Sequence, residues 1–167
     1  MTIEIRKLNS QDALPFREFR VAALRESPDR FGEDASEMEA HSNELVAALL
    51  AAPSTSVFGA LLNNEIVGSI GMHSQNRIKT KHIAHLWGMY VSPPNRNEGI
   101  ARRLVQFLLN EAKAMPQIEQ VKLSVVTQNA AAIKLYESFG FEIYGTDMNA
   151  IKSGGNYLDE HLMVLRF

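Results

Sequence analysis

The stretch "YVSPPNRNEGIARRLVQFLL", residues 90–109, constrains the fold of this chain more than any other segment. Its first residues have the character of a strand end, and its last residues alternate with a helical period. At about 100° per residue, the apolar side chains of the helix fall on one arc and the polar ones on the opposite arc. The apolar arc holds Ile100, Leu104, Phe107, Leu108, Ala112 and Met115. The pattern predicts a strand, a short loop and a helix that packs one face on a sheet.

Gly99 stands where this helix begins, and two interpretations of it remain open. Glycine there lets a ligand approach the backbone, while the unpaired N–H groups and the positive end of the helix dipole favour an anion such as a pyrophosphate. Alternatively, glycine serves only the geometry of a tight strand-to-helix turn. Neither a Walker A loop nor the Gly-x-Gly-x-x-Gly dinucleotide fingerprint is present.

The rest of the chain continues with alternating strand and helix patterns, which predict one domain over residues 1–167. Its expected order is β-α-α-β-β-β-α-β-α-β-β, typical of an α/β domain with a mixed sheet. Asn63 and Asn64 predict a hairpin turn, because asparagine tolerates positive φ. The expected strands cover residues 2–8, 55–62, 65–74, 81–91, 119–127, 141–150 and 157–167, and the expected helices about 10–25, 35–51, 99–115 and 129–140.

Composition excludes several functional classes. With 17 Lys plus Arg against 19 Asp plus Glu, the near-balanced charge argues against nucleic acid or an anionic membrane as the main partner. The absence of cysteine removes disulfides, thiolate metal sites and a cysteine nucleophile. The sequence contains no signal-like apolar run and no stretch long enough to span a bilayer. We expect a cytoplasmic protein.

Two motifs carry a resemblance to a known family. "RNEGIA", residues 96–101, resembles the Arg/Gln-x-x-Gly-x-Gly/Ala signature of the GNAT superfamily of acyl-CoA N-acyltransferases. The family's second pattern, Asn-x-x-Ala-x-x-x-Tyr-x-x-x-Gly-Phe, is matched by Asn129, Ala132, Tyr136, Gly140 and Phe141. The resemblance covers nearly the whole chain. It implies a GNAT-like mixed, mostly antiparallel central sheet flanked by helices, and acetyl-CoA as co-substrate.

The resemblance also implies which residues bind the coenzyme. Backbone N–H groups of the signature loop would hold the pyrophosphate, and the preceding strand would hydrogen-bond the pantetheine arm. One residue departs from the family, because Asn97 stands where a glycine is frequent; asparagine tolerates the left-handed conformation the loop needs. The implied set is Met89, Val91, Arg96, Asn97, Glu98, Gly99, Ile100, Ala101, Arg102, Asn129 and Ala132.

Tyr136 and Asn129 each have two interpretations. Seven residues apart, they lie on nearly one helix face. By resemblance, that face looks at the pantetheine arm and the Tyr136 hydroxyl acts as the acid that protonates the leaving thiolate. The alternative is a helix-capping asparagine and a core aromatic residue.

His85 is the candidate base, on the strand that would run beside the coenzyme. In a regular strand His85, Trp87 and Met89 share one side, and Gly88 would permit a bulge. A histidine has a suitable unperturbed pKa, roughly 6.5. A structural histidine, and a proton carried away by ordered water, are the alternatives. His82 and His85 would face opposite sides of a strand, so we expect no metal.

These residues predict an N-acetyltransferase that moves an acetyl group directly to a primary amine of a small molecule or a peptide N-terminus, since no cysteine can carry the acetyl group. The alternative is a non-catalytic acyl-CoA-binding sensor or partner module. The sequence leaves a homodimer open. By resemblance, the connection between the first two helices borders the acceptor cleft, so its acidic run would form a rim that concentrates a cationic amine; the alternative is a solvated helix face. Its carboxylates are Glu26, Asp29, Glu33, Asp34, Glu37, Glu39 and Glu44.

Overall fold

The central feature of the computed structural model, which describes residues 2–167, is a seven-stranded sheet in the order β1-β2-β3-β4-β5-β7-β6. Neighbouring strands are antiparallel except β4 and β5, which are parallel. The predicted mixed, mostly antiparallel sheet is therefore confirmed. The strands are β1 (Glu4–Lys7), β2 (Thr55–Leu62), β3 (Glu65–Ser74), β4 (Ile83–Val91), β5 (Gln120–Val126), β6 (Glu142–Ser153) and β7 (Asn156–Arg166).

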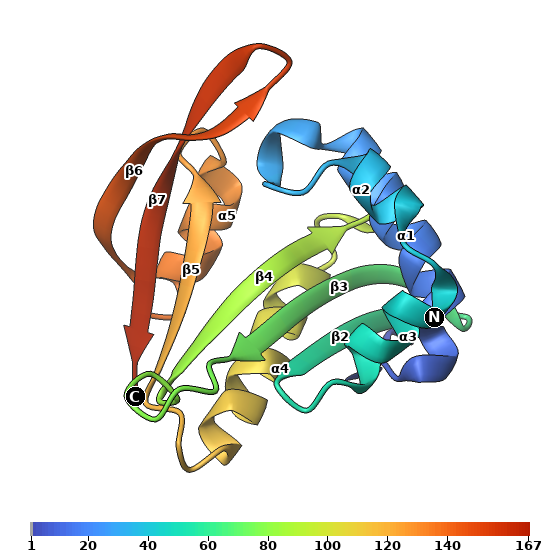
Figure 1. Ribbon diagram of the computed structural model, residues 1–167, viewed down its shortest axis with the longest axis horizontal. Coiled ribbons are helices and arrows are strands. Elements are labelled where there is room, and N and C mark those ends of the chain that lie inside the picture. Colours follow the sequence, from blue (N-terminus) through green and yellow to red (C-terminus); the bar gives the residue numbers. More distant parts are fainter. Residues whose placement is uncertain (1) are drawn as a thin grey trace.

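Helices cover both faces of this sheet (Figure 1). On one face α4 buries Leu104, Val105 and Leu108 completely against the strands. On the other, α1 and α3 enclose a second cluster around Phe16 and Leu50. Each such side chain contributes about 1.5–3 kcal/mol through burial. The helices are α1 (Ala13–Glu26), α2 (Ala35–Ala40), α3 (Asn43–Ala51), α4 (Ile100–Ala114) and α5 (Ala130–Glu137), with 3-10 turns η1 (Ser10–Asp12), η2 (Pro28–Arg30) and η3 (Pro93–Asn95).

The helix expected over residues 35–51 is two helices, so the predicted element order lacks one α. The chain turns extended at His41 and Ser42. The Ser42 hydroxyl accepts the N–H of Leu45 at 3.1 Å and thereby caps a new helix. At the first helix, Asn9 caps η1, which precedes α1. The last two strands extend to a hairpin turn at Gly154 and Gly155.

A bulge in β4 shifts the alternation of its side chains. Ser69 of β3 pairs with Tyr90 and Gly71 pairs with Trp87, so two residues of β4 face one residue of β3. Gly88 occupies the bulge with φ 62°, a left-handed conformation that favours glycine. Trp87 therefore packs on the α1 side of the sheet and Met89 on the α4 side. The two were expected on one side, because residues two apart in a regular strand share a face.

The parallel strands β4 and β5 separate before they reach the bulge. Pairing between β4 and β5 runs from Ile83↔Gln120 to His85↔Lys122 and then stops. Beyond that point the two strands diverge, as Figure 1 shows. Because β5 goes on to pair with β7, a wedge opens between β4 and β5.

We predict that Gly71→Ala destabilises the protein through the Trp87 side chain. A Cβ at residue 71 would lie 2.2 Å from the Trp87 ring. Overpacking of this kind costs about 1–3 kcal/mol, and each kcal/mol lowers the melting temperature of a chain this size by roughly 2–4 °C. Thermal unfolding followed by the fluorescence of this single tryptophan measures both the shift and the displaced ring. Gly32→Ala, where nothing lies within 4 Å, is the control; equal melting temperatures for the two variants would contradict the prediction.

Candidate active site

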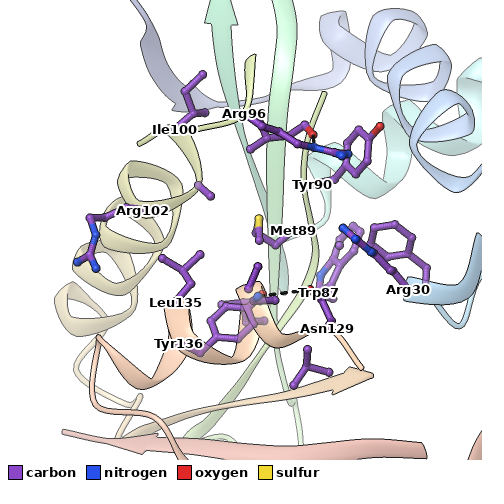
Figure 2. A pocket seen from close by; sticks show the side chains of 18 of the residues that line it. Arg30, Trp87, Met89, Tyr90, Arg96, Ile100, Arg102, Asn129, Leu135 and Tyr136 are labelled. Atoms are coloured by element: carbon purple, nitrogen blue, oxygen red, sulfur yellow. Dashed lines mark hydrogen bonds between the residues drawn. The ribbon is translucent and has the colours of Figure 1, made fainter. Parts of the chain in front are cut away.

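A cavity of about 390 Å³ fills the wedge between β4 and β5. Its walls come from β4, the loop that follows, the start of α4, β5, α5 and η2 (Figure 2). The structure thus brings together segments that lie up to about 100 residues apart in the chain. Among the predicted site residues, it places Met89, Val91, Arg96, Asn97, Gly99, Ile100, Ala101, Arg102, Asn129, Ala132 and Tyr136 on the cavity wall.

Two predicted residues lie elsewhere. Glu98 is exposed and does not line the cavity. His85 lies below the wedge, where its Nε2 is 3.1 Å from Nε2 of Gln75 and its ring stacks on His73 at 5.0 Å between centroids. Burial, and then the charges of His73 and Lys122, lower the pKa of His85 below its usual value, so its ring is neutral at pH 7.

The loop before α4 has the geometry of an anion site. Gly99 is the N-cap residue with φ 76°, and Asn97 adopts φ 65°, the left-handed conformation that the departure from the family pattern requires. The first intrahelical hydrogen bond runs from the Arg103 N–H to the Gly99 carbonyl at 3.1 Å. The N–H groups before Arg103 therefore have no partner within the helix, and they lie at the positive end of its dipole.

Arg96 fastens this loop to two other elements. Its Nε donates to the Val91 carbonyl at 2.9 Å and its Nη2 to Glu26 at 3.0 Å, while its guanidinium lies 5.4 Å from the Tyr90 ring centroid. The Tyr90 hydroxyl also donates to Glu26, at 3.0 Å. The Ser27 hydroxyl, followed by Arg96 and Tyr90, lowers the pKa of Glu26 to about 2. The Glu26 carboxylate therefore joins the end of α1 to β4 and to the loop.

Asn129 and Tyr136 have the cap and packing contacts of the structural interpretation, and both also line the cavity. The Asn129 side chain accepts the Ala132 N–H at 3.3 Å and caps α5, yet it also lines the cavity. Tyr136 is buried, and its ring packs edge-on against Phe141 at 5.7 Å. Figure 2 shows both residues on the side of the cavity away from Arg96. Burial raises the pKa of Tyr136 well above its usual value, so its hydroxyl is protonated at neutral pH.

Sequence patterns did not identify one whole side of the cavity. Arg30 and Phe31 line it from the segment after α1, and Trp87 and Tyr90 line it from β4. Tyr90 faces the same side as Trp87 because the bulge lies between them, and Gly71 leaves the space for the Trp87 ring. In a regular strand two residues three apart would face opposite sides, so no alternation pattern indicated this wall, and no local signal indicated Arg30.

The acidic run contributes structural contacts rather than cavity lining. Asp34 and Glu37 form the capping box of α2, Glu33 pairs with Arg20, and Glu39 pairs with Arg25. Asp29 accepts the Ser153 hydroxyl at 2.6 Å. None of the run's carboxylates lines the cavity.

Polar side chains in the middle of β7 also lie outside the cavity. Asp159 accepts the Asn149 N–H at 2.8 Å and His161 lies 2.9 Å from Thr146, while burial and Asp147 raise the pKa of Glu160. Within residues 2–167, no three His, Cys, Asp or Glu side chains are grouped so as to hold a metal ion. The same residues include no helix with the length and apolarity needed to cross a bilayer.

Comparison with known proteins agrees with this architecture. The crystal structure of a GNAT-family acetyltransferase from Streptococcus pneumoniae superposes with a TM-score of 0.89 over 99% of both chains at 22% identity. That of yncA from Salmonella typhimurium, which contains its cofactor acetyl-CoA, gives 0.78 over 99% of this chain and 94% of that one, at 20% identity. These likenesses establish the fold.

Two curated relatives match part of the sequence. The L-amino acid N-acetyltransferase AaaT of Escherichia coli K12 is 30% identical over 104 residues, which are 62% of this chain and 64% of AaaT. The streptothricin acetyltransferase of Escherichia coli is 28% identical over 106 residues, 64% of this chain and 58% of that relative. The matched segments thus span less than two thirds of either relative.

A mixed sheet opened between two parallel strands, with a helix N-terminus at the mouth of the opening, defines an acyltransferase type of fold. The sequence profile of the acetyltransferase (GNAT) family matches residues 17–141. The chain belongs to that family.

We predict that Gly99→Val weakens acetyl-CoA binding at least tenfold in calorimetry. Valine disfavours the left-handed conformation at residue 99, and its side chain would fill the space from which a pyrophosphate reaches the N–H groups. Gly154→Val imposes the same kind of backbone strain, at φ 55° in a hairpin turn, but leaves the cavity intact. Equal affinities for a folded Gly99→Val variant and the Gly154→Val control would contradict the site assignment.

Proposed function

We propose that this protein is an N-acetyltransferase that moves the acetyl group of acetyl-CoA directly to a primary amine. One observation carries the proposal: the wedge between β4 and β5 places a helix N-terminus at one end of a cavity and a buried, protonated tyrosine in its wall. The first element suits the pyrophosphate of the coenzyme, and the second suits the thiolate that must leave.

The backbone of β4 would align the coenzyme's arm. Beyond His85 the edge of β4 that faces β5 has no strand partner, so its N–H and C=O groups need hydrogen bonds from another source. An amide-containing arm lying along Met89 and Val91 supplies them. An N–H at this end of β4 would then polarise the thioester carbonyl oxygen as negative charge develops on it.

The transfer needs one bond made and one broken. The amine nitrogen attacks the thioester carbonyl carbon, a C–N bond forms, and the C–S bond breaks. The nitrogen loses one proton to water, the departing sulfur receives one from the Tyr136 hydroxyl, and the tyrosinate then regains a proton from water. The transfer is direct in this proposal, and the chain contains no cysteine thiol to carry the acetyl group.

We propose that water, rather than a side chain, takes the proton from the amine. No histidine and no carboxylate line the cavity. His85, the base expected from the sequence, lies outside the cavity beside Gln75, and its lowered pKa makes it a weaker base. Among the alternatives that the sequence left open, this arrangement favours ordered water.

The names of two relatives support an amine acceptor, since one acetylates L-amino acids and the other streptothricin. A peptide N-terminus is the other acceptor class, and a plant NAA60 structure of 18% identity was solved with a bisubstrate analogue.

The alternative function, a non-catalytic acyl-CoA-binding module, has no use for the Tyr136 hydroxyl. The test is thiol release from acetyl-CoA with a panel of amines; binding of acetyl-CoA without acceptor-dependent release would favour the module. A cytoplasmic location stays a prediction.

We predict that Tyr136→Phe lowers turnover about 100-fold, with coenzyme affinity and melting temperature nearly unchanged. General acid help is worth roughly 10²- to 10⁴-fold, and a thiolate leaves well enough for the lower end to apply. Phenylalanine keeps the edge-on contact with Phe141, so the variant tests the hydroxyl alone. Tyr144→Phe, at an exposed tyrosine outside the cavity, is the matched control. A loss below about threefold would make Tyr136 a packing residue.

We predict that His85→Gln keeps turnover within about threefold and leaves the pH profile in place. With water as the proton acceptor, the rate rises with pH as the amine itself loses its proton, and no limb follows a histidine. Steady-state rates between pH 5.5 and about 9 measure this. Loss of an acidic limb in the variant would show instead that His85 acts as the base.

A further inference from the structure

The charged side chains on the cavity wall are all positive. Arg30, Arg96 and Arg102 line it, and no Asp or Glu does. Arg96 is bound to Val91 and Glu26, and Arg102 donates to the Ser138 hydroxyl at 2.8 Å while lying 5.1 Å from the Phe139 ring centroid. Among the described residues the Arg30 guanidinium has neither a hydrogen bond nor an ion pair, so its charge is uncompensated.

Arg30 lies at the end of the cavity that the coenzyme's phosphates would not occupy. It is the last residue of η2, and in Figure 2 it lies across the cavity from Arg102 and α4. The aromatic side chains of Phe31, Trp87 and Tyr90 line the same side. Under the proposed function the pyrophosphate sits at the start of α4, so this side belongs to the acceptor.

A second guanidinium stands directly behind this aromatic wall. Arg20 is 4% exposed, and its charge centre lies 4.7 Å from the Phe31 ring and 5.9 Å from the Trp87 ring. Its Nε donates to Glu33 at 3.1 Å, but its buried Nη1 has no hydrogen-bond partner. That Nη1 is the atom nearest to the place of a Cβ on Gly88, at 3.1 Å, so it points to the bulge that lines the cavity.

An unpartnered donor in a buried guanidinium is costly unless a ligand or water completes it. Glu33 balances the charge of Arg20, which does not line the cavity, so the excess of positive charge on the acceptor side is that of Arg30. The acidic run does not offset this excess, because its carboxylates are held by caps, by Ser153 and by other arginines.

We propose that the acceptor is an amine that also carries a carboxylate, as an α-amino acid does, and that Arg30 binds this carboxylate. This inference rests on the proposed function and adds a specificity-determining residue to it. Arg30 supplies the ion pair, and the aromatic wall takes an apolar side chain. A carboxylate held on this side leaves the amino group of the same molecule facing the middle of the cavity.

The test uses three matched acceptor series, L-phenylalanine, L-leucine and L-methionine, each beside its carboxamide and its decarboxylated amine. We expect Arg30→Gln to lower kcat/KM for the amino acids about 10- to 100-fold, mainly through KM, because a hydrogen-bonded ion pair is lost. Rates for the amides and amines, and the KM for acetyl-CoA, should change less than about threefold. Taking the variant-to-wild-type ratio for each acceptor cancels the different reactivities of the amines.

Two further variants separate charge from structure. Arg30→Lys should restore part of the lost kcat/KM, whereas Arg25→Gln, at an exposed arginine of α1 outside the cavity, should leave all rates unchanged. The inference is overturned if the amides or amines are the better wild-type acceptors, or if Arg30→Gln lowers all three members of a series equally.

Product binding distinguishes failure of this inference from failure of the proposed function. N-acetyl-L-phenylalanine is titrated calorimetrically into the protein saturated with coenzyme A, with N-acetyl-2-phenylethylamine as the uncharged comparison. If the carboxylate product binds, and binds more weakly to Arg30→Gln, the carboxylate site is supported. Absence of thiol release with every acceptor would then reject the acetyl transfer but not the carboxylate site. Equal binding of the two products would reject the carboxylate site, while thiol release from any amine would keep the transferase function.

Discussion

Strands β4 and β5 share only the pairing from Ile83 to His85, and the site depends on the separation that follows. A parallel pair held together along its full length would satisfy its backbone groups internally and leave no room for a ligand. Once the pair opens, the free edge of β4 needs hydrogen bonds, and the start of α4 comes to the mouth of the wedge. The left-handed Gly88 completes the arrangement, because its bulge turns Trp87 and Met89 to opposite faces.

Glu26 connects the two sides of that opening. It accepts hydrogen bonds from Arg96, in the loop before α4, and from Tyr90, in the aromatic wall of the cavity. Its side chain is 39% exposed, so the ion pair contributes only about 0–1 kcal/mol to stability. Its larger effect is geometric, since it fixes the loop, the end of α1 and the aromatic wall relative to one another.

Local signals predicted the parts of this protein that depend on local physics. Gly99, the amphipathic helix after it, the Asn63–Asn64 turn and the bulge at Gly88 each follow from backbone preferences of a few residues. The interruption between α2 and α3 at Ser42 was missed because the helical spacing of apolar residues continues through it, although Ser42 is a suitable N-cap residue. Pairs such as Arg96 with Glu26, 70 residues apart, have no signature in a single sequence. Strand alternation grouped His85, Trp87 and Met89 on one side, but the bulge separates Met89 from Trp87, and alternation could not tell that the wedge begins just beyond His85.

Although the net charge is only −2, acidic and basic side chains have different places in this structure. Carboxylates in the run after α1 satisfy helix N-termini and buried or neighbouring arginines, which are structural tasks that bring no negative charge to the cavity wall. Arginines, by contrast, supply every charge that lines the cavity. A coenzyme with several phosphates already favours a positive wall at one end. The positive charge of Arg30, on the far side, has no such explanation, and it would repel an acceptor that carries only a cationic amine. A zwitterionic acceptor removes this conflict. Its carboxylate faces the arginine while its amine faces the uncharged centre of the cavity.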